Sequence, residues 1–483
     1  SQGQFYQETD ISGTSDDTGP GNSASGVSVV QIQVKKFKAG STYYWSNYSH
    51  FDTTVENWED ATGLANWSFS IGNQYWESGY MYEAKSRAKD WATNQELNLP
   101  SVFFYIDKDA PTSGIEAPVD NNYYNTLTEI SGTCIDEPST LYNSGVNVVE
   151  IRIYDENNPT EPYWDATNNT WSSTETWNSA TTYTSSWTFT MNDANWTDTH
   201  VYRINSRATD NLGIVEVNYS TTTFTFDTTP GNSNITFPVN GGEYNSVTSI
   251  DGNASASPAP AVLVQVEISD TTPEPDLYWN GSTWTETAIW IDADGIAPWT
   301  YTIDYETATW TDGHQYFIRT RVLDEADNWS DPGGVGVAFT YDITKPLSGV
   351  TSPQDNTYVN SLTQITGTST DEKSGVDYVK VLITQDPYGS PLYWDGSAWS
   401  PSADNWQPTT LQNPPKGDLS EDWSYDVLKS SHLTSGTRYK VQSRAWDEAG
   451  NAQDIGYKIE FIADFDEPST SISWPVEGGT YTV

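Results

Sequence analysis

The segment Tyr439-Lys-Val-Gln-Ser-Arg-Ala-Trp-Asp447 decides how this chain is built, because its pattern also occurs at three earlier positions. The common form is Tyr-x-x-x-[Ser/Thr]-Arg-[Ala/Val]-x-Asp, and the earlier copies are Tyr82 to Asp90, Tyr202 to Asp210 and Tyr316 to Asp324. Apolar and polar residues alternate within it, which is the period of a β-strand with one buried face. The pattern indicates four copies of one strand-rich unit.

Other features recur at the same spacing. An Ile-x-Gly triplet begins at Ile11, Ile130, Ile250 and Ile365, so consecutive copies lie 115 to 120 residues apart. Helical periodicity is nearly absent, because Gly, Pro, Asn and Asp interrupt the apolar runs. Short strands divided by turns at this frequency predict an all-β chain of tandem immunoglobulin-like β-sandwich domains arranged end to end, with the repeated tyrosine as a tyrosine corner.

The repeats also predict the domain limits. We expect domain 1 at 1–106, lacking its strand A, domain 2 at 107–226, domain 3 at 227–341, domain 4 at 342–463, and a C-terminal strand at 464–483.

A Tyr-Trp pair recurs in every unit, as in Tyr278-Trp279 and Tyr393-Trp394. Asn280-Gly281 follows the third pair and accepts the positive φ angles of a tight hairpin, so Trp284 on the return strand should face Trp279. These aromatic residues are either a stacking platform for sugar rings or the packing of a sandwich without disulfides. Recurrence in all four repeats favours packing.

Composition excludes several classes of function. The chain has 66 acidic and 21 basic residues and a formal net charge of −45, which repels nucleic acids and anionic lipids, whereas divalent cations fit this charge. No apolar run approaches the roughly 20 residues of a membrane span. The single cysteine, Cys134, has no partner for a disulfide within the chain, so stability must come from packing and not from covalent cross-links.

Three segments resemble the bacterial Ig-like repeats that occur in tandem in very large extracellular surface proteins and adhesins. They are Asp342-Ile-Thr-Lys-Pro346, Ser374-Gly375-Val376 and Arg444-Ala-Trp-Asp-Glu-Ala-Gly-Asn451. The resemblance extends over essentially the whole chain. It implies a structural or adhesive protein that is extracellular or at the cell surface, and repeats of this kind often stiffen their junctions with calcium.

Acidic residues should gather where one domain meets its predecessor. In this fold the start of strand A, the B–C loop and the F–G loop lie at one pole of the sandwich. Carboxylate and amide oxygens crowded there suit Ca²⁺, which takes six to eight oxygen ligands. The expected ligands are Asp107, Asp109, Asp136 and Asp210 in domain 2, and Asp342, Asp371, Asp447 and Asn451 in domain 4.

The third domain departs from this pattern, because Ser255 to Pro258 replace the acids of the B–C loop and leave Asp227, Asp324 and Asp327. The alternative interpretation of all these residues is that Asp side chains cap loops by accepting backbone N–H bonds without a metal.

The two ends of the sequence complement each other. Domains 2 to 4 open with a strand A before the Ile-x-Gly triplet, whereas the first repeat does not, and Ser471 to Val483 match a strand A with no domain behind it. An uncovered sheet edge invites a strand from another chain. The tail of one copy could complete domain 1 of the next, bringing Asp464 near Asp16 and Asp90. The residues expected to make that contact are Ser471, Ile472, Trp474, Val476 and Tyr481. Alternatively, the sequence is one repeat of a much longer continuous chain.

The sequence favours a non-enzymatic protein and is compatible with three functions. Four His and one Cys offer no catalytic constellation, so we do not expect an enzyme. The first expectation is a structural subunit of an extracellular filament or surface layer, assembled head to tail with copies of itself or as repeats of a giant chain. The alternatives are the stalk of a calcium-rigidified adhesin and an array of carbohydrate-binding modules with surface glycans as partners. Asn-x-Ser/Thr sequons, which could carry sugars, occur at Asn47, Asn66, Asn168, Asn195, Asn218, Asn234, Asn253, Asn280 and Asn328.

Overall fold

The second repeat shows the strand plan of the whole chain in the computed structural model. Its smaller sheet has the order β10 (Thr112–Ala117), β12 (Glu129–Ile135), β18 (Ser186–Thr190), β17 (Thr181–Thr182). The larger sheet has the order β11 (Asn122–Tyr124), β20 (Ser220–Phe226), β19 (Val201–Asp210), β13 (Val146–Asp155), β14 (Tyr163–Asp165), β15 (Thr170–Ser172), with β16 (Asn178–Ser179) beside β13. The β11–β20 pair is parallel and the other pairs are antiparallel, so strand A crosses from one sheet to the other between β10 and β11.

The third and fourth repeats have the same plan. The third consists of β21 (Asn232–Phe237), β23 (Ser249–Ser255), β29 (Trp299–Thr302), β28 (Asp294–Gly295) in one sheet and β22 (Gly242–Tyr244), β31 (Val337–Tyr341), β30 (His314–Asp324), β24 (Ala261–Asp270), β25 (Leu277–Trp279), β26 (Trp284–Thr285), β27 (Ile291–Asp292) in the other. The fourth consists of β32 (Leu347–Ser352), β34 (Ile365–Thr370), β40 (Ser420–Tyr425), β39 (Thr410–Leu411) and of β33 (Thr357–Val359), β42 (Tyr457–Ala463), β41 (Arg438–Asp447), β35 (Val376–Gln385), β36 (Leu392–Trp394), β37 (Trp399–Ser400), β38 (Gln407–Pro408).

The first repeat differs in its smaller sheet. Its larger sheet contains β1 (Gln4–Tyr6), β9 (Ser101–Ile106), β8 (Tyr80–Asp90), β3 (Val27–Lys38), β4 (Ser41–Ser46), β5 (His50–Thr53), β6 (Glu59–Asp60). In the part of the chain that the structure describes, the smaller sheet is only β2 (Asp10–Thr14) paired with β7 (Asn66–Ser70). β1 runs parallel to β9, as β11 does to β20, so the second half of strand A is present and the first half has no counterpart among these residues.

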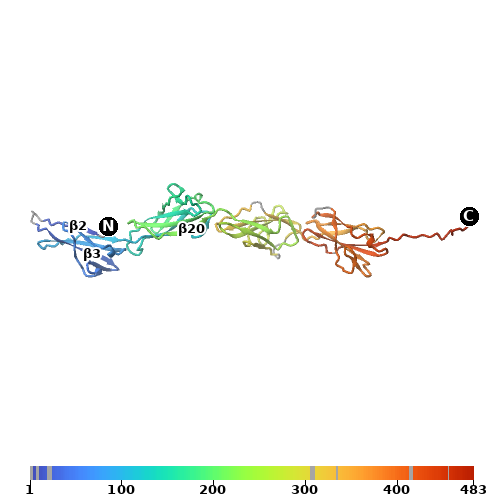
Figure 1. The fold of residues 1–483 in the computed structure, drawn as a ribbon, viewed down its shortest axis with the longest axis horizontal. Coiled ribbons are helices and arrows are strands. Elements are labelled where there is room, and N and C mark those ends of the chain that lie inside the picture. Colours follow the sequence, from blue (N-terminus) through green and yellow to red (C-terminus); the bar gives the residue numbers. More distant parts are fainter. Residues whose placement is uncertain are drawn as a thin grey trace. The chain divides into compact units, whose positions relative to one another are not determined.

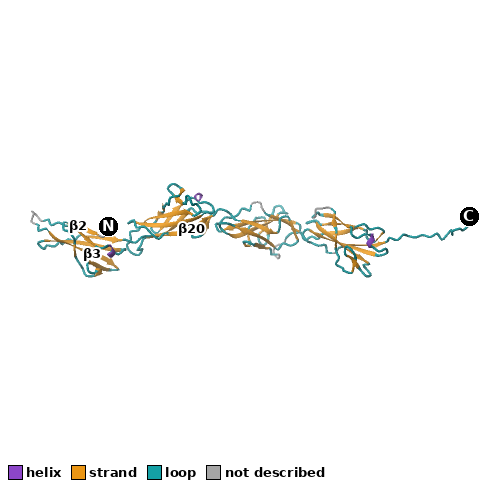
Figure 2. Cartoon of the chain, viewed as in Figure 1, coloured by secondary structure: helices purple, strands orange, loops and turns teal. Residues whose placement is uncertain are grey.

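The described residues are 4–6 (backbone alone), 10–18, 24–304, 310–332, 336–412, 417–454 and 456–482. Within them the helices are single 3₁₀ turns at Asn73–Tyr75, Asp193–Asn195 and Ser430–His432, and strands dominate (Figure 2). The chain is therefore all-β, as predicted, and none of its described helices has the length and apolar character to cross a bilayer.

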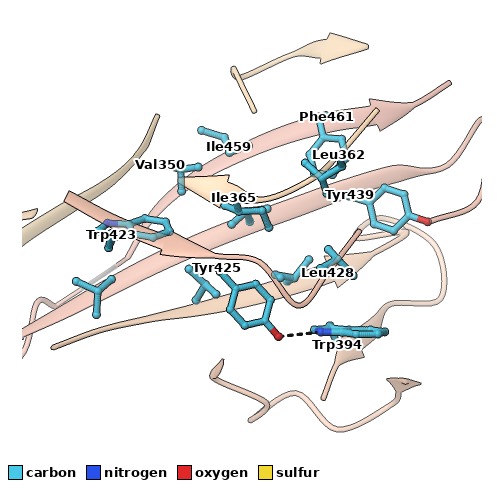
Figure 3. Close-up of a cluster of buried hydrophobic side chains, with 14 of the residues drawn as sticks. Val350, Leu362, Ile365, Trp394, Trp423, Tyr425, Leu428, Tyr439, Ile459 and Phe461 are labelled. Atoms are coloured by element: carbon cyan, nitrogen blue, oxygen red, sulfur yellow. Dashed lines mark hydrogen bonds between the residues drawn. The ribbon is translucent and has the colours of Figure 1, made fainter. Parts of the chain in front are cut away.

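Each sandwich has its own hydrophobic core, and the fourth is shown in Figure 3. Trp394 and Trp423 lie buried in it, and the Trp394 indole donates a 2.9 Å hydrogen bond to the Tyr425 hydroxyl (Figure 3). The repeated tyrosine forms the predicted corner. The Tyr439 hydroxyl accepts a hydrogen bond of 2.8 Å from the Thr434 N–H, and Tyr82, Tyr202 and Tyr316 each bond in the same way to the residue five positions earlier.

By its internal contacts the chain divides into two units, Ser1–Thr229 with Glu325–Asn328, and Pro230–Asp324 with Trp329–Val483. The colours of Figure 1 follow the sequence through both units.

Candidate metal centres

Two groups of three aspartates lie at the starts of the second and fourth sandwiches. In the second, Asp107 follows β9, Asp136 follows β12 and Asp210 ends β19. In each group one carboxylate oxygen of every residue lies within 4.8 Å of the others, and all the side chains are buried. The members of the second group are Asp342, Asp371 and Asp447, which follow β31, follow β34 and end β41.

Backbone N–H groups hold the first group in place. Ser144 donates to Asp107 Oδ2 (2.7 Å), Gly145 to Asp136 Oδ2 (2.6 Å) and Ile214 to Asp210 Oδ1 (2.6 Å). The expected loop capping is therefore present. It leaves one oxygen over, because Asp136 Oδ1 is buried and has no hydrogen-bond partner. Such an atom is costly unless a cation or a proton joins it.

The second group repeats this arrangement. Gly375 N–H donates to Asp371 Oδ1 (3.0 Å), and Ser374 donates from both N–H and Oγ to Asp342 Oδ2. Asn451 N–H donates to Asp447 Oδ1 (2.6 Å), while its amide donates to Asp447 Oδ2 and to the Asp342 carbonyl. Asp371 Oδ2, like Asp136 Oδ1, is buried without a partner.

The electrostatics show that negative charge is held unfavourably at both groups. Burial, together with the charges of Asp107 and Asp210, raises the pKa of Asp136 to about 6. Burial also raises the pKa of Asp447 to about 6, with Asp342 and Asp371 adding to the shift. Buried like charges favour protonation unless a cation neutralises them.

One further acid near the second group has no signal in the sequence. Glu243 lies on β22 of the third sandwich, and burial followed by the charges of Asp342, Glu448, Asp371 and Asp447 raises its pKa to about 7. Its Oε2 is buried and without a partner. The middle residues of β11 and β33 are Tyr123 and Tyr358, so the repeat pattern does not predict an acid here.

The other predicted ligands lie outside these groups. Asp109, Asp327, Asp16 and Asp464 are exposed, and Asp90 is half-buried. Asp227 and Asp324 are buried but belong to neither group. In the first sandwich it is Asp17, not Asp16, that accepts the N–H of a loop glycine, as Asp136 does, because Gly26 donates to Asp17 Oδ2 (2.8 Å).

The chemistry of both groups fits a hard divalent cation. Every ligating side-chain atom that the groups present is oxygen, and a serine hydroxyl bonds the carboxylates of each group, from Ser144 in the first and Ser374 in the second. Oxygen-only ligand sets supplied by loops suit Ca²⁺ better than Zn²⁺, which binds through nitrogen and sulfur.

The recurrent aromatic residues pack inside the sandwiches. Trp279 pairs with Trp284 across the predicted hairpin with ring centroids 5.4 Å apart, and Trp279 is buried. Its counterparts Trp45, Trp164 and Trp394 are buried as well, which removes them from any sugar-binding surface.

The predicted glycosylation sites differ in their exposure. Asn328 is buried and its amide donates to the Asp227 carbonyl, so no glycan can be accommodated there. Asn195 and Asn280 are half-buried. The exposed sequons are Asn47, Asn66, Asn168, Asn218, Asn234 and Asn253.

No family model and no curated protein matches the chain. Solved structures similar to it include the tetra-tandem repeat in the extending region of a large adhesion protein, with 15% identity, 95% of this chain and 96% of that chain covered, and a TM-score of 0.34. A 1.5-MDa bacterial ice-binding adhesin matches with 11% identity, 74% and 99% coverage, and a TM-score of 0.31. A Ca²⁺-stabilized adhesin of an Antarctic bacterium matches with 13% identity, 94% coverage of both chains and a TM-score of 0.26. By their descriptions, these proteins are large adhesins or repeats of one.

Proposed function

We propose that this chain is a non-enzymatic structural array of extracellular Ig-like domains, part of a filament, surface layer or adhesin stalk, in which Ca²⁺ bound at the two aspartate groups stiffens the junctions. The observation that carries the proposal is the pair of buried carboxylate oxygens, Asp136 Oδ1 and Asp371 Oδ2, left without partners within groups of like charge.

Each group joins a domain to the strand that precedes it. Asp107 follows β9 of the first sandwich directly, and the other two residues of its group belong to the second. A cation held by all three links the end of one domain to two loops of the next. Removing the freedom of the linker in this way turns flexibly joined domains into a stiffer series, which is what a spacer or fibre needs.

The same reasoning weakens the carbohydrate-module interpretation, because the aromatic residues shared by the repeats are core residues. The contacts of two histidines fit a structural role. His200 and His314 each bond a buried aspartate, Asp155 and Asp270, at 2.8 Å.

The experiment is thermal unfolding of the full chain in Ca²⁺ and in metal-free buffer, with two pairs of neighbouring substitutions. Asp136→Asn and Asp371→Asn should each remove part of the stabilisation by Ca²⁺. The matched controls, Glu137→Gln and Glu372→Gln, change the acid next in sequence, outside the groups, and should retain it. At 100 times its Kd, one bound ion stabilises the folded state by about 2.7 kcal/mol. Equal responses to Ca²⁺ in all five proteins would contradict the proposal.

A further inference from the structure

Among the described residues, no strand of the first sandwich occupies the sheet edge that β10, β21 and β32 occupy in the others. β10, β21 and β32 pair antiparallel with β12, β23 and β34. β2 holds the corresponding place in the first sandwich, and among the described residues it pairs only with β7.

The residues beneath that edge are uncovered. Val102 on β9 is 62% exposed, whereas its counterpart on β42, Ile459, is 2% exposed. Ser86 is half-buried and its counterpart Ser206 is fully buried. Two adjoining cavities of about 410 and 450 Å³ lie along the edge, and both are lined by Thr14, Trp67 and Ser86. Together they form a groove whose lining includes every residue of β2, from Asp10 to Thr14. A strand paired with β2 would lie in this groove.

The C-terminal segment has the pattern of the strand that would fill this groove. Ser469-Thr-Ser-Ile-Ser-Trp474 precedes Pro475, as β10, β21 and β32 precede a proline, and Ile472 holds the place of Ile115, Ile235 and Val350, which pack on their cores. Within the described residues this segment forms no strand, and Ile472 is 82% and Trp474 71% exposed.

The tail already has the turn that ends a strand A. Val476 N–H donates to the Tyr481 hydroxyl (2.6 Å). The same bond joins Val119 to Tyr124 (2.9 Å) and Val239 to Tyr244 (3.0 Å) in the second and third sandwiches.

The groove offers the polar partners that strand A uses elsewhere. In the second sandwich, Ser113 of strand A bonds Ser206 Oγ (2.9 Å) and Glu216 Oε2 (2.7 Å). In the fourth, Ser348 bonds Ser443 and Gln453 in the same way. Ser86 and Glu96 hold these two places in the first sandwich and line the groove, and Thr470 holds the place of Ser113 and Ser348 in the tail.

We propose that Ser469–Trp474 of a second copy of this chain inserts antiparallel to β2, with Ile472 opposite Gly13 and Thr470 between Ser86 and Glu96. The register copies that of β10, where Ile115 lies opposite Gly132. Because the groove and the donated strand are different surfaces, the contact is heterologous and continues head to tail into a fibre. The tail beyond Pro475 is not required, since β1 already pairs with β9.

The insertion also completes a third aspartate group, a consequence that rests on the proposed function. Asp464 lies eight residues before Ile472, as Asp107 lies eight before Ile115. The acceptor supplies Asp17, bonded to Gly26 as Asp136 is to Gly145, and Asp90 in the place of Asp210. Ca²⁺ should therefore strengthen the contact between copies.

The test is sedimentation velocity of the full chain over a range of concentrations in Ca²⁺, alongside Ile472→Asp and Ser473→Asp. Ser473 holds the place of Glu116, whose side chain is exposed on strand A, so a charge is tolerated there. The original chain and S473D should form long oligomers, while I472D should associate at least about 100-fold more weakly, because it places a charge on the core face. Three monomeric proteins, three equal polymers, or S473D failing together with I472D would each overturn the proposal.

The register is tested by mixing a chain carrying Ser15→Cys with one carrying Thr470→Cys. The native Cys134 is buried and does not compete. A disulfide between the two chains should form for this pair and not for Ser15→Cys with Ser473→Cys, and the reverse result would overturn the register. Calcium binding by the I472D monomer is measured separately. If the I472D monomer binds Ca²⁺ but the original chain does not assemble, strand donation alone is contradicted. If the original chain assembles but the I472D monomer binds no Ca²⁺, the calcium proposal alone is contradicted.

Discussion

At the scale of single residues, the chain concentrates its unusual electrostatics in two small groups. The three aspartates of each group are buried and accept hydrogen bonds from loop N–H groups. One carboxylate oxygen in each group, Asp136 Oδ1 or Asp371 Oδ2, still has no hydrogen-bond partner. The proposed Ca²⁺ sites rest on this combination of burial, like charge and an oxygen without a hydrogen-bond partner.

The raised pKa values give a pH dependence of unusual sign. The pKa values of Asp136 and Asp447 are about 6 and that of Glu243 is about 7 in the folded chain, all above those of the unfolded chain, near 4. In metal-free buffer the folded state binds more protons in this range, so the free energy of unfolding should rise as the pH falls from about 7.5 to 5.

With Ca²⁺ bound the trend should reverse, because the ligands must be deprotonated to hold the ion. Thermal unfolding at pH 7.5 and 5, with and without Ca²⁺, measures both signs. The double substitution Asp136→Asn, Asp447→Asn should flatten the metal-free rise, and an unchanged slope would contradict the assignment.

Glu243 gives a prediction specific to the second group. Glu243→Gln removes a buried negative charge, so metal-free unfolding of the fourth domain should need a higher temperature. Its Ca²⁺ affinity should fall, since attraction for the cation is reduced. The control is Glu372→Gln, which removes the same charge from an exposed side chain outside the group. Equal changes in unfolding temperature and Ca²⁺ affinity for the two variants would show that Glu243 does not act on the aspartate group.

At the scale of strands, the repeat could be predicted because each recurring motif has a structural role. The Ile-x-Gly triplet gives a buried isoleucine and a glycine on which the sandwich tryptophan lies: a Cβ at Gly132 would stand 2.6 Å from the Trp187 ring and 1.9 Å from the Gly114 oxygen. The tyrosine corner and the Trp-Trp hairpins follow equally from local pattern.

What could not be predicted depends on contacts between repeats or across sheets. Glu243 interacts with acids of the next domain, and nothing near it in the sequence marks that neighbourhood. The partners of the repeated arginine also differ between repeats. Arg207 pairs with Glu150 (2.8 Å), but Arg87 bonds Gln31 instead, and its guanidinium carbon lies 4.1 Å from the Trp58 ring centroid. Aromatic stacking is a partner that the charge pattern does not reveal.

The open edge predicts unequal tolerance at two equivalent strand positions. Val102→Asp should change the free energy of unfolding of the monomer by no more than about 0.5 kcal/mol, because that side chain is already exposed. Ile459→Asp buries a charge and should cost more than about 3 kcal/mol. Chemical denaturation of both variants in the I472D background checks this, and similar costs would mean that the groove is closed in solution.

At the scale of the whole molecule, four sandwiches follow one another along the sequence, and groups of three buried aspartates lie at two of their junctions. Under the proposed function, these groups and the proposed strand exchange both serve mechanical continuity.

The central claim is that the aspartate groups bind Ca²⁺, and isothermal titration of the I472D monomer with CaCl₂ at neutral pH tests it most directly. The account predicts two bound ions per chain, one for each group, and none at these affinities once Asp136→Asn and Asp371→Asn are combined. A chain that takes up no Ca²⁺, or one whose binding is unchanged by the two substitutions, would contradict it.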